Sequence, residues 1–258
     1  MEAEKRAEAD WWKASGLSLD ERQLGLLNQF AGLLREWNER INLISRKDME
    51  ALETHHLLHA LLMAGAIQLE PGQRVLDVGT GGGIPGIPLA ILNPEVSFFL
   101  CDSVGKKTAA VDAMVKALGL KNVTVINKRA EELESTWEFV VGRAVTALPQ
   151  FLGWITKNLR EKGNEAFPNG VLYLKGTRYV EELSDLGIEP WKVYDLGAAS
   201  KDPYFADKFL IHLKTEDLQE CPALQPEPKK KKKVKSGRGG RKHRMGGRGK
   251  EDVWGGAE

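Results

Sequence analysis

Residues 77–86 read DVGTGGGIPG, and this stretch decides the fold. It joins the apolar run RVLDV at residues 74–78 to a second apolar segment at residues 87–92. The first run has the length and composition of a buried strand, and the second is typical of a short helix. Glycines at such a junction let the backbone turn sharply and let a ligand approach the main chain closely. The stretch therefore predicts a strand–loop–helix unit with a ligand at the loop.

Short apolar runs alternate with helical segments along the rest of the chain. The strands that we expect are residues 74–79, 96–102, 122–127, a stretch within 137–144, 170–176, 192–196 and 208–212. The helices among them are expected at residues 87–92, 106–118, 148–159 and 180–186. This alternation is typical of an α/β fold, a doubly wound and mostly parallel sheet with helices on both faces. The last two strands have little helix between them, which predicts an antiparallel hairpin at one edge.

The first 70 residues have a different pattern. Apolar side chains at spacings of three and four predict an amphipathic helix, and they are Leu24, Leu27, Phe30, Leu34, Trp37 and Ile41. Ser18 followed by Glu21 predicts the cap at its start. A second helical run is expected over residues 48–67. We expect an N-terminal helical cap over residues 1–70, an α/β domain over 71–222, and a tail over 223–258 that is disordered because it has few apolar residues.

The charge is divided between the body and the tail. Residues 229–258 contain 12 Lys and Arg against 3 Asp and Glu, a charge of +9, whereas the other residues contain 25 against 33, a charge of −8. A strongly basic tail on an acidic body indicates a polyanionic partner, with nucleic acid the leading candidate. A tail that only improves solubility is the alternative.

Several classes of protein are disfavoured by composition. No stretch approaches the ~20 apolar residues of a membrane helix, so we expect no membrane partner. Cys101 and Cys221 are too few for a disulfide framework or a four-Cys zinc site, which favours a cytoplasmic location. His55 and His59 have the i,i+4 spacing of metal ligands, with His56 between them, but no third ligand is evident. We therefore expect no metal.

The glycine loop fits two nucleotide ligands. Gly81, Gly83 and Gly86 match the dinucleotide fingerprint G-x-G-x-x-G. Asp77 and Gly79, with the glycines that follow, instead match the loop of methyltransferases that use S-adenosylmethionine. A carboxylate beside the loop would repel a diphosphate and attract a ligand that carries sulfonium and ammonium groups. The sequence favours S-adenosylmethionine over NAD, and a loop with only a structural role stays open.

Two polar residues follow other strands of the expected sheet. Asp102 ends the second strand and is placed to accept both ribose hydroxyls of a nucleoside, or alternatively to cap the next helix. Arg143 ends the fourth strand, at the edge where open parallel sheets hold their ligands. Its alternative role is a salt bridge to a neighbouring acid. We expect an adenosine pocket at this edge.

Five segments of the chain together carry a resemblance to a known family. They are Trp37-Asn38 with Asn42 to Ser45, His55 to Leu58, Asp77 to Pro88, Leu100 to Lys107, and Gly142 to Ala144. In this order they resemble the RsmG (GidB) family of bacterial 16S rRNA guanine-N7 methyltransferases, over about residues 24–212. His59-Ala60 stand where the family often has Asp-Ser, and the basic tail lies outside the usual family core.

The resemblance implies a class I, Rossmann-like methyltransferase domain with a seven-stranded sheet. It implies S-adenosylmethionine as cofactor, with Gly79 and Ile84 along the donor, Asp102 on the ribose and Ala130-Glu131 beside the adenine. It gives Arg143 a catalytic position near the methionine moiety or the target base. The full set of expected cofactor-binding residues is Asp77, Gly79, Thr80, Gly81, Gly83, Ile84, Asp102, Ala130, Glu131 and Arg143.

The expected acceptor is N7 of a guanine in 16S rRNA of the small ribosomal subunit, in the loop near the decoding centre. N7 carries a lone pair and no proton, so alignment of the reactants suffices and no general base is needed. Cys101 lies within a strand and Cys221 in the exit loop, and neither suits the nucleophile of a cytosine-C5 enzyme. We expect a monomer whose tail contacts RNA phosphates. An NAD(P)-dependent oxidoreductase and a non-enzymatic rRNA-binding assembly factor are the alternatives.

Overall fold

The structure is a computed structural model that describes residues 10–161, 163–200 and 202–225. The chain divides into two compact units, residues 1–226 and 227–258, and all described residues belong to the first. The expected disorder of the basic tail falls almost entirely outside the described residues.

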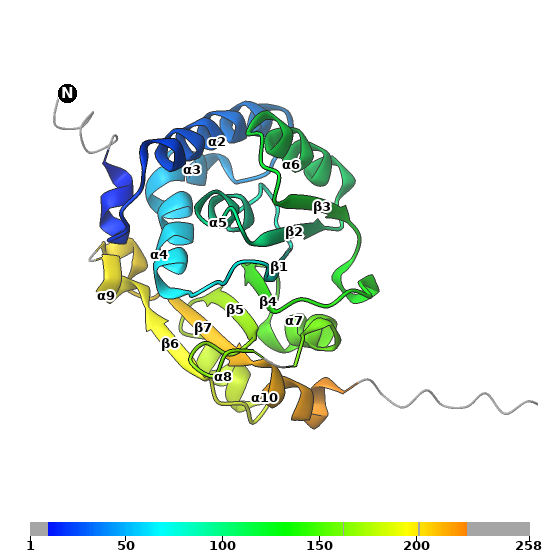
Figure 1. Ribbon diagram of the computed structural model, residues 1–258. Helices are drawn as coiled ribbons and strands as arrows, with labels where there is room; N and C mark the ends of the chain where they lie inside the picture. Colours follow the sequence, from blue (N-terminus) through cyan, green and yellow to red (C-terminus); the bar gives the residue numbers. More distant parts are fainter. Residues whose placement is uncertain (1–9, 162, 201, 226–258) are drawn as a thin grey trace, which may run out of the picture. The chain divides into compact units, whose positions relative to one another are not determined.

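A seven-stranded sheet forms the middle of the described unit, in the order β3-β2-β1-β4-β5-β7-β6 (Figure 1). The strands are β1 Arg74–Val78, β2 Ser97–Asp102, β3 Val123–Asn127, β4 Phe139–Arg143, β5 Gly170–Lys175, β6 Lys192–Asp195 and β7 Phe209–Lys214. The first five strands pair in parallel, which confirms the doubly wound arrangement. β7 is antiparallel to both β5 and β6, so the expected terminal hairpin forms with β6, and not β7, at the edge.

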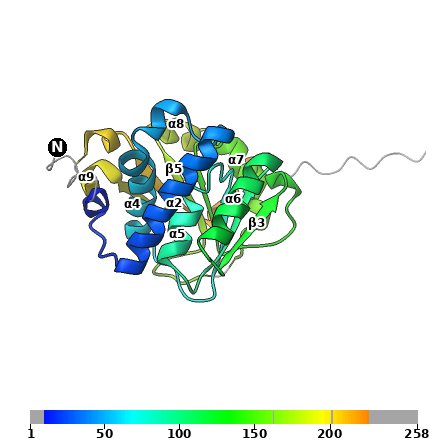
Figure 2. The same cartoon turned by 90° about the horizontal axis from the view of Figure 1, so that it is seen from above.

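Helices cover both faces of the sheet (Figures 1 and 2). The α-helices are α2 Glu21–Arg40, α3 Arg46–Met49, α4 Leu58–Ala66, α5 Gly86–Leu92, α6 Gly105–Ala117, α7 Leu148–Ile155, α8 Tyr179–Ser184, α9 Leu196–Ser200 and α10 Thr215–Glu220. The short helical segments are η1 Trp11–Ser15, η2 Leu52–Leu57, η3 Ala130–Glu132, η4 Thr156–Asn158, η5 Pro203–Phe205 and η6 Pro222–Leu224. On one face α2 packs against α5 and α6, and α4 against α5, whereas α7 packs against α8.

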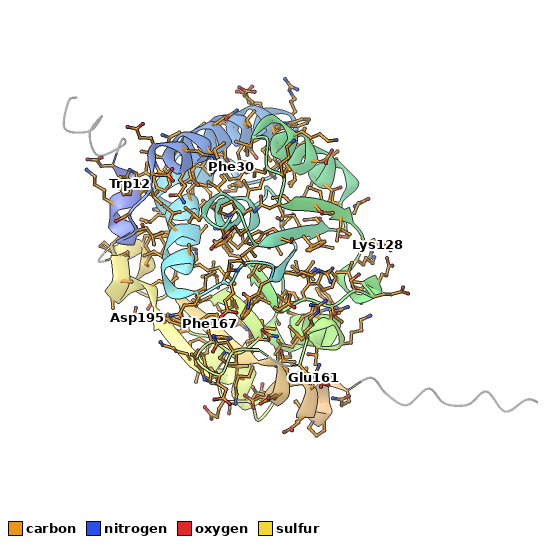
Figure 3. All side chains as sticks on the ribbon, viewed as in Figure 1. Trp12, Phe30, Lys128, Glu161, Phe167 and Asp195 are labelled. Atoms are coloured by element: carbon orange, nitrogen blue, oxygen red, sulfur yellow. The ribbon has the colours of Figure 1, made fainter. Side chains whose placement is uncertain are left out.

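The side chains of the strands alternate between the two faces of the sheet, so the core is divided into two clusters, one on each face. Phe139 and Val141 of β4 belong to the cluster beneath α2, α4 and α5. Val140 belongs to the second cluster, which includes Phe151 of α7. Successive side chains of a strand point to opposite faces, so Arg143 continues the Phe139–Val141 row toward the α4 side. Figure 3 shows Phe30 of α2, which is fully buried, inside the helical layer.

The N-terminal helices differ from the prediction in two details. α2 begins at Glu21 with Asp20 as its cap, because the Asp20 carboxylate accepts from the Gln23 amide while the Gln23 side chain accepts from the Asp20 amide. This reciprocal pair satisfies two helix-end donors, so the predicted Ser18 cap is wrong.

The expected single run over residues 48–67 is divided into α3, the π-helical segment η2 and α4. Leu52 and Leu57 are both fully buried. They are five residues apart, and the i→i+5 bonding of a π turn suits that spacing.

Candidate functional site

The glycine loop between β1 and α5 needs glycine for its backbone. Gly79, Gly81 and Gly83 have φ angles of 67°, 56° and 89°, in the left-handed region that residues with a Cβ rarely adopt. Space excludes side chains as well, because a Cβ on Gly79 would lie 2.9 Å from a Val145 methyl carbon. One on Gly83 would lie 2.6 Å from Cδ1 of Ile87. The predicted tight turn is therefore confirmed.

Asp77 closes this loop from inside the core. Its Oδ2 accepts hydrogen bonds from the Thr80 hydroxyl at 2.6 Å and from the Gly86 amide at 3.0 Å. The side chain is 1% exposed, and its Oδ1 has no hydrogen-bond partner. The sequence interpretation, in which this carboxylate repels or attracts a ligand from beside the loop, is therefore wrong, because the loop's hydrogen bonds hold it in the interior.

The Asp77 carboxyl is correspondingly difficult to ionise. Burial raises its pKa from 3.8 to about 6. The hydrogen bonds from Thr80 and Gly86 and the positive charge of Arg143 favour the carboxylate, but they only partly offset the loss of water.

A first cavity of about 320 Å³ opens at the carboxyl ends of β1, β2 and β4. Four of the expected cofactor residues line it: Gly79, Asp102, Ala130 and Glu131. Val145 and Trp154 complete the wall on the α7 side. We call this the donor cavity. Five other expected residues are not in its wall but in the loop behind it, and they are Asp77, Thr80, Gly81, Gly83 and Ile84.

Asp102 is held in place by the backbone around it. Its Oδ2 accepts from the Gly81 amide at 3.1 Å, and its Oδ1 accepts from the Val104 amide at 2.9 Å. The expected alternative, a cap on the next helix, does not form, because α6 has Val104 at its N-cap position and no side-chain cap. Each carboxylate oxygen accepts up to two hydrogen bonds, so both retain capacity for hydroxyl donors from the cavity.

Arg143 faces a second cavity, of about 420 Å³, on the α4 side of the same sheet edge. Asp48, His56, His59 and Lys208 also line it. We call this the acceptor cavity. Burial lowers the pKa of the Arg143 guanidinium, although Tyr204, Asp77 and Asp48 oppose the shift. Within the described ranges no carboxylate forms an ion pair with it, so the expected alternative, a salt bridge, is not formed.

The two cavities share Ala144, the residue between Arg143 and Val145. Its φ of 53° is left-handed, a conformation that costs free energy in a residue with a Cβ. The Tyr173 hydroxyl stabilises this turn, because it donates to the Thr146 carbonyl at 3.1 Å and accepts from the Val145 amide at 3.3 Å. Sequence analysis named Ala144 only as part of the Gly142 to Ala144 segment, and it missed Val145 and Tyr173, for which the sequence carries no evident signal.

His56 and His59 are uncharged at neutral pH. Burial, reinforced by the charge of Arg143, lowers the pKa of His56 to about 4. The same two causes hold the pKa of His59 well below 6.5. His55 stacks on Tyr204 with ring centroids 3.6 Å apart. In the part of the chain that the structure describes, no three His, Cys, Asp or Glu side chains gather in a way that suits a metal ion.

Cys101 lines the donor cavity without the properties of a nucleophile. Burial raises the pKa of its thiol to about 11, and the thiol donates to the Lys128 carbonyl at 3.3 Å. The thiolate is the reactive form of cysteine, so this thiol is a poor nucleophile at neutral pH.

No described helix is long and apolar enough to cross a membrane.

The described unit has the fold of class I methyltransferases, with a cavity at the carboxyl ends of its parallel strands. A solved structure of magnesium protoporphyrin IX methyltransferase from Synechocystis, with bound S-adenosylmethionine, shares the fold with a TM-score of 0.51 at 13% identity. The similarity covers 76% of this chain and 98% of that one.

The chain belongs to the GidB family, described as rRNA small subunit methyltransferase G, which matches residues 23–192. A ribosomal RNA small subunit methyltransferase G from Bacteroides fragilis is 50% identical over 192 residues, 72% of this chain and 91% of the relative. One from Flavobacterium johnsoniae is 45% identical over 196 residues, 76% of this chain and 93% of the relative. The resemblance that the sequence motifs indicated is thereby confirmed.

The buried carboxyl of Asp77 predicts a specific pH dependence of stability. Between pH 3.8 and about 6 the folded state keeps a proton that the unfolded state has released, so stability falls as pH rises through this range. Asp77→Asn removes this titration. The difference between the free energies of unfolding of the variant and the parent should therefore increase by about 3 kcal/mol as the pH rises from 3.8 to about 6. Urea unfolding below and above this range measures it.

Asp112→Asn is the matched control, since Asp112 lies on α6 and forms only an exposed pair with Lys116. Its pH profile should run parallel to that of the parent protein. A parallel profile for Asp77→Asn would show that the Asp77 carboxyl titrates normally.

Proposed function

We propose that this protein transfers the methyl group of S-adenosylmethionine to N7 of a guanine in 16S rRNA, in the small-subunit loop near the decoding centre. The observation that carries the proposal is the family match over residues 23–192. The donor and acceptor cavities, which share Ala144 in their walls, support it, because methyl transfer needs two substrates held end to end. We infer that the reaction takes place in the cytoplasm, where ribosomal subunits are made.

The donor cavity suits the nucleoside part of S-adenosylmethionine. The Asp102 carboxylate is fixed by two backbone amides and lines the cavity, as an acceptor for ribose hydroxyls should. Gly79 has no side chain to obstruct the ligand, and Ala130 and Glu131 offer a wall for the adenine. We assign Asp77, Thr80, Gly81, Gly83 and Ile84 a supporting role in which they shape the loop. When bound, the cofactor supplies a methyl group made electrophilic by its sulfonium.

The chain's own contribution to the reaction is alignment. Guanine N7 attacks with its lone pair, so no side chain has to remove a proton first. Arg143 lines the acceptor cavity next to Ala144, where the two cavities meet, and we assign it the catalytic contact with the target base. The family match disfavours the oxidoreductase that the glycine pattern leaves open, and it disfavours a non-enzymatic assembly factor.

The direct test is methyl transfer from labelled S-adenosylmethionine to small ribosomal subunits that lack the modification. We expect N7-methylguanosine at a single site in 16S rRNA, identified by nucleoside analysis and mapping. Labelling of another base or another position would contradict the proposed acceptor. If the protein binds the donor but transfers no methyl group, the assignment of the donor cavity would stand and the proposed acceptor would be wrong.

Asp102→Ala should weaken donor binding by about 1–3 kcal/mol, because the ribose hydroxyls lose a charged acceptor. Calorimetric titration with S-adenosylmethionine measures this. Asp112→Ala, on the exposed surface of α6, is the control and should bind the donor as the parent does. Unchanged affinity in Asp102→Ala would remove the ribose assignment.

We also propose that the basic residues 229–258 bind RNA phosphates. Removal of this segment should weaken association with 16S rRNA and flatten its salt dependence, because fewer counterions are released on binding. Donor affinity should stay unchanged. Binding assays across a salt series provide the measurement, and equal RNA affinity of the truncated and full-length chains at every salt concentration would leave the segment a solubilising role.

A further inference from the structure

The acceptor cavity contains opposite charges, which suit the donors and acceptors on the edge of a guanine base. Asp48 and Arg143 both line it, and each influences the ionisation of Tyr204. Arg143 also interacts electrostatically with Asp48 itself. Arg143 precedes Ala144, which lines both this cavity and the donor cavity. The cavity therefore offers a carboxylate and a guanidinium that interact, and the guanidinium belongs to the residue next to the wall shared with the donor cavity.

Donors and acceptors are adjacent on one edge of guanine. N1–H and the 2-amino group donate hydrogen bonds, O6 beside them accepts, and N7 beside O6 is the atom that receives the methyl group. A guanidinium suits O6, and a carboxylate suits two N–H donors. We infer that Asp48 reads the N1–H and 2-amino edge of the target guanine, while Arg143 holds O6. This inference rests on the proposed function and adds a residue that determines base specificity.

The local structure prepares Asp48 for this contact. Its Oδ2 accepts from the Ser45 hydroxyl at 2.6 Å, and the Asp48 amide donates back to that hydroxyl oxygen at 3.2 Å. Among the described residues no donor is bound to Oδ1. The hydrogen bond from Ser45 lowers the pKa of the carboxyl, with further contributions from His56 and His55, so Asp48 is ionised at neutral pH. One oxygen is anchored and the other is available to a ligand.

Another acid of the cavity, Asp207, is a weaker candidate. Asp207 is exposed, and the cation that it influences is Lys208 rather than Arg143. The side chain that accepts a hydrogen bond from N1–H has to lie near the group that holds O6, because the two positions are adjacent on the base. Asp48 interacts electrostatically with Arg143 and Asp207 does not, which favours Asp48.

The reaction itself strengthens the contact that we assign to Asp48. The N7 lone pair forms the new N–C bond as the C–S bond breaks, and the pair of that bond stays on sulfur. The cofactor loses its positive charge, and the guanine gains one without losing a proton. A carboxylate at N1–H therefore binds the transition state and the cationic product more strongly than the neutral base, which is the requirement for catalysis.

The test compares 16S rRNA that carries guanine at the target position with rRNA that carries inosine there, assembled by ligation. Inosine keeps N1–H, O6 and N7 but lacks the 2-amino group. The parent should prefer guanine by about 10- to 100-fold in kcat/KM, since one hydrogen bond to a charged acceptor is lost. In Asp48→Ala this preference should fall close to 1. Asp48→Asn keeps the size of the side chain and should retain part of the preference.

Asp207→Asn is the matched control from the same cavity, and its preference for guanine should equal that of the parent. Donor affinity, measured by calorimetry, should be unchanged in all three variants, which shows that they are folded. An unchanged preference in Asp48→Ala, or a preference lost only in Asp207→Asn, would overturn the assignment of Asp48 alone. Absence of transfer by the parent to either rRNA would overturn the proposed function and this inference together.

Discussion

The site depends on one buried carboxylate. Asp77 accepts from the Thr80 hydroxyl and the Gly86 amide, which ties the first turn of the glycine loop to the start of α5. The closed loop presents the Gly81 amide to Asp102, so the orientation of this carboxylate, which we propose as the ribose acceptor, follows from it. Burial of Asp77 opposes its ionisation and raises its pKa to about 6. Free energy is therefore spent on the geometry of a ligand site rather than on stability.

The second constraint is the alternation of side chains along β4. Because consecutive residues point to opposite faces, Gly142 makes room for Phe151 and Tyr173 on the α7 side, whereas Arg143 emerges on the α4 side. The chain then turns through the left-handed Ala144, held by the Tyr173 hydroxyl. One strand end thus supplies the cation of the acceptor cavity and the wall that both cavities share.

Local patterns predicted the sheet well because each strand is a short apolar run between polar turns, and the position of Asp102 followed from the same reasoning. Details that depend on which of several neighbouring groups forms a hydrogen bond were not predictable from the sequence. Asp20 displaces Ser18 as the cap because Gln23 completes a reciprocal pair with it. The direction of the Asp77 carboxylate is set by donors three and nine residues away. The acceptor cavity combines η2, β4 and η5, and no sequence period relates segments so far apart.

The charge of the acceptor cavity bears on its two histidines, of which His59 is buried and His56 is half-buried. A guanine methylated at N7 leaves as a cation, and each additional positive charge nearby would oppose its formation. Burial and the Arg143 guanidinium keep His56 and His59 neutral, so these imidazoles fill the cavity wall without adding charge. Lys175 is paired with Glu182 at 2.8 Å, which partly neutralises it as well. Lys208 is a further cation in the lining. In the proposed reaction the Arg143 guanidinium would hold the base, and the neutral histidines and the Asp48 carboxylate would not oppose the charge that the base acquires.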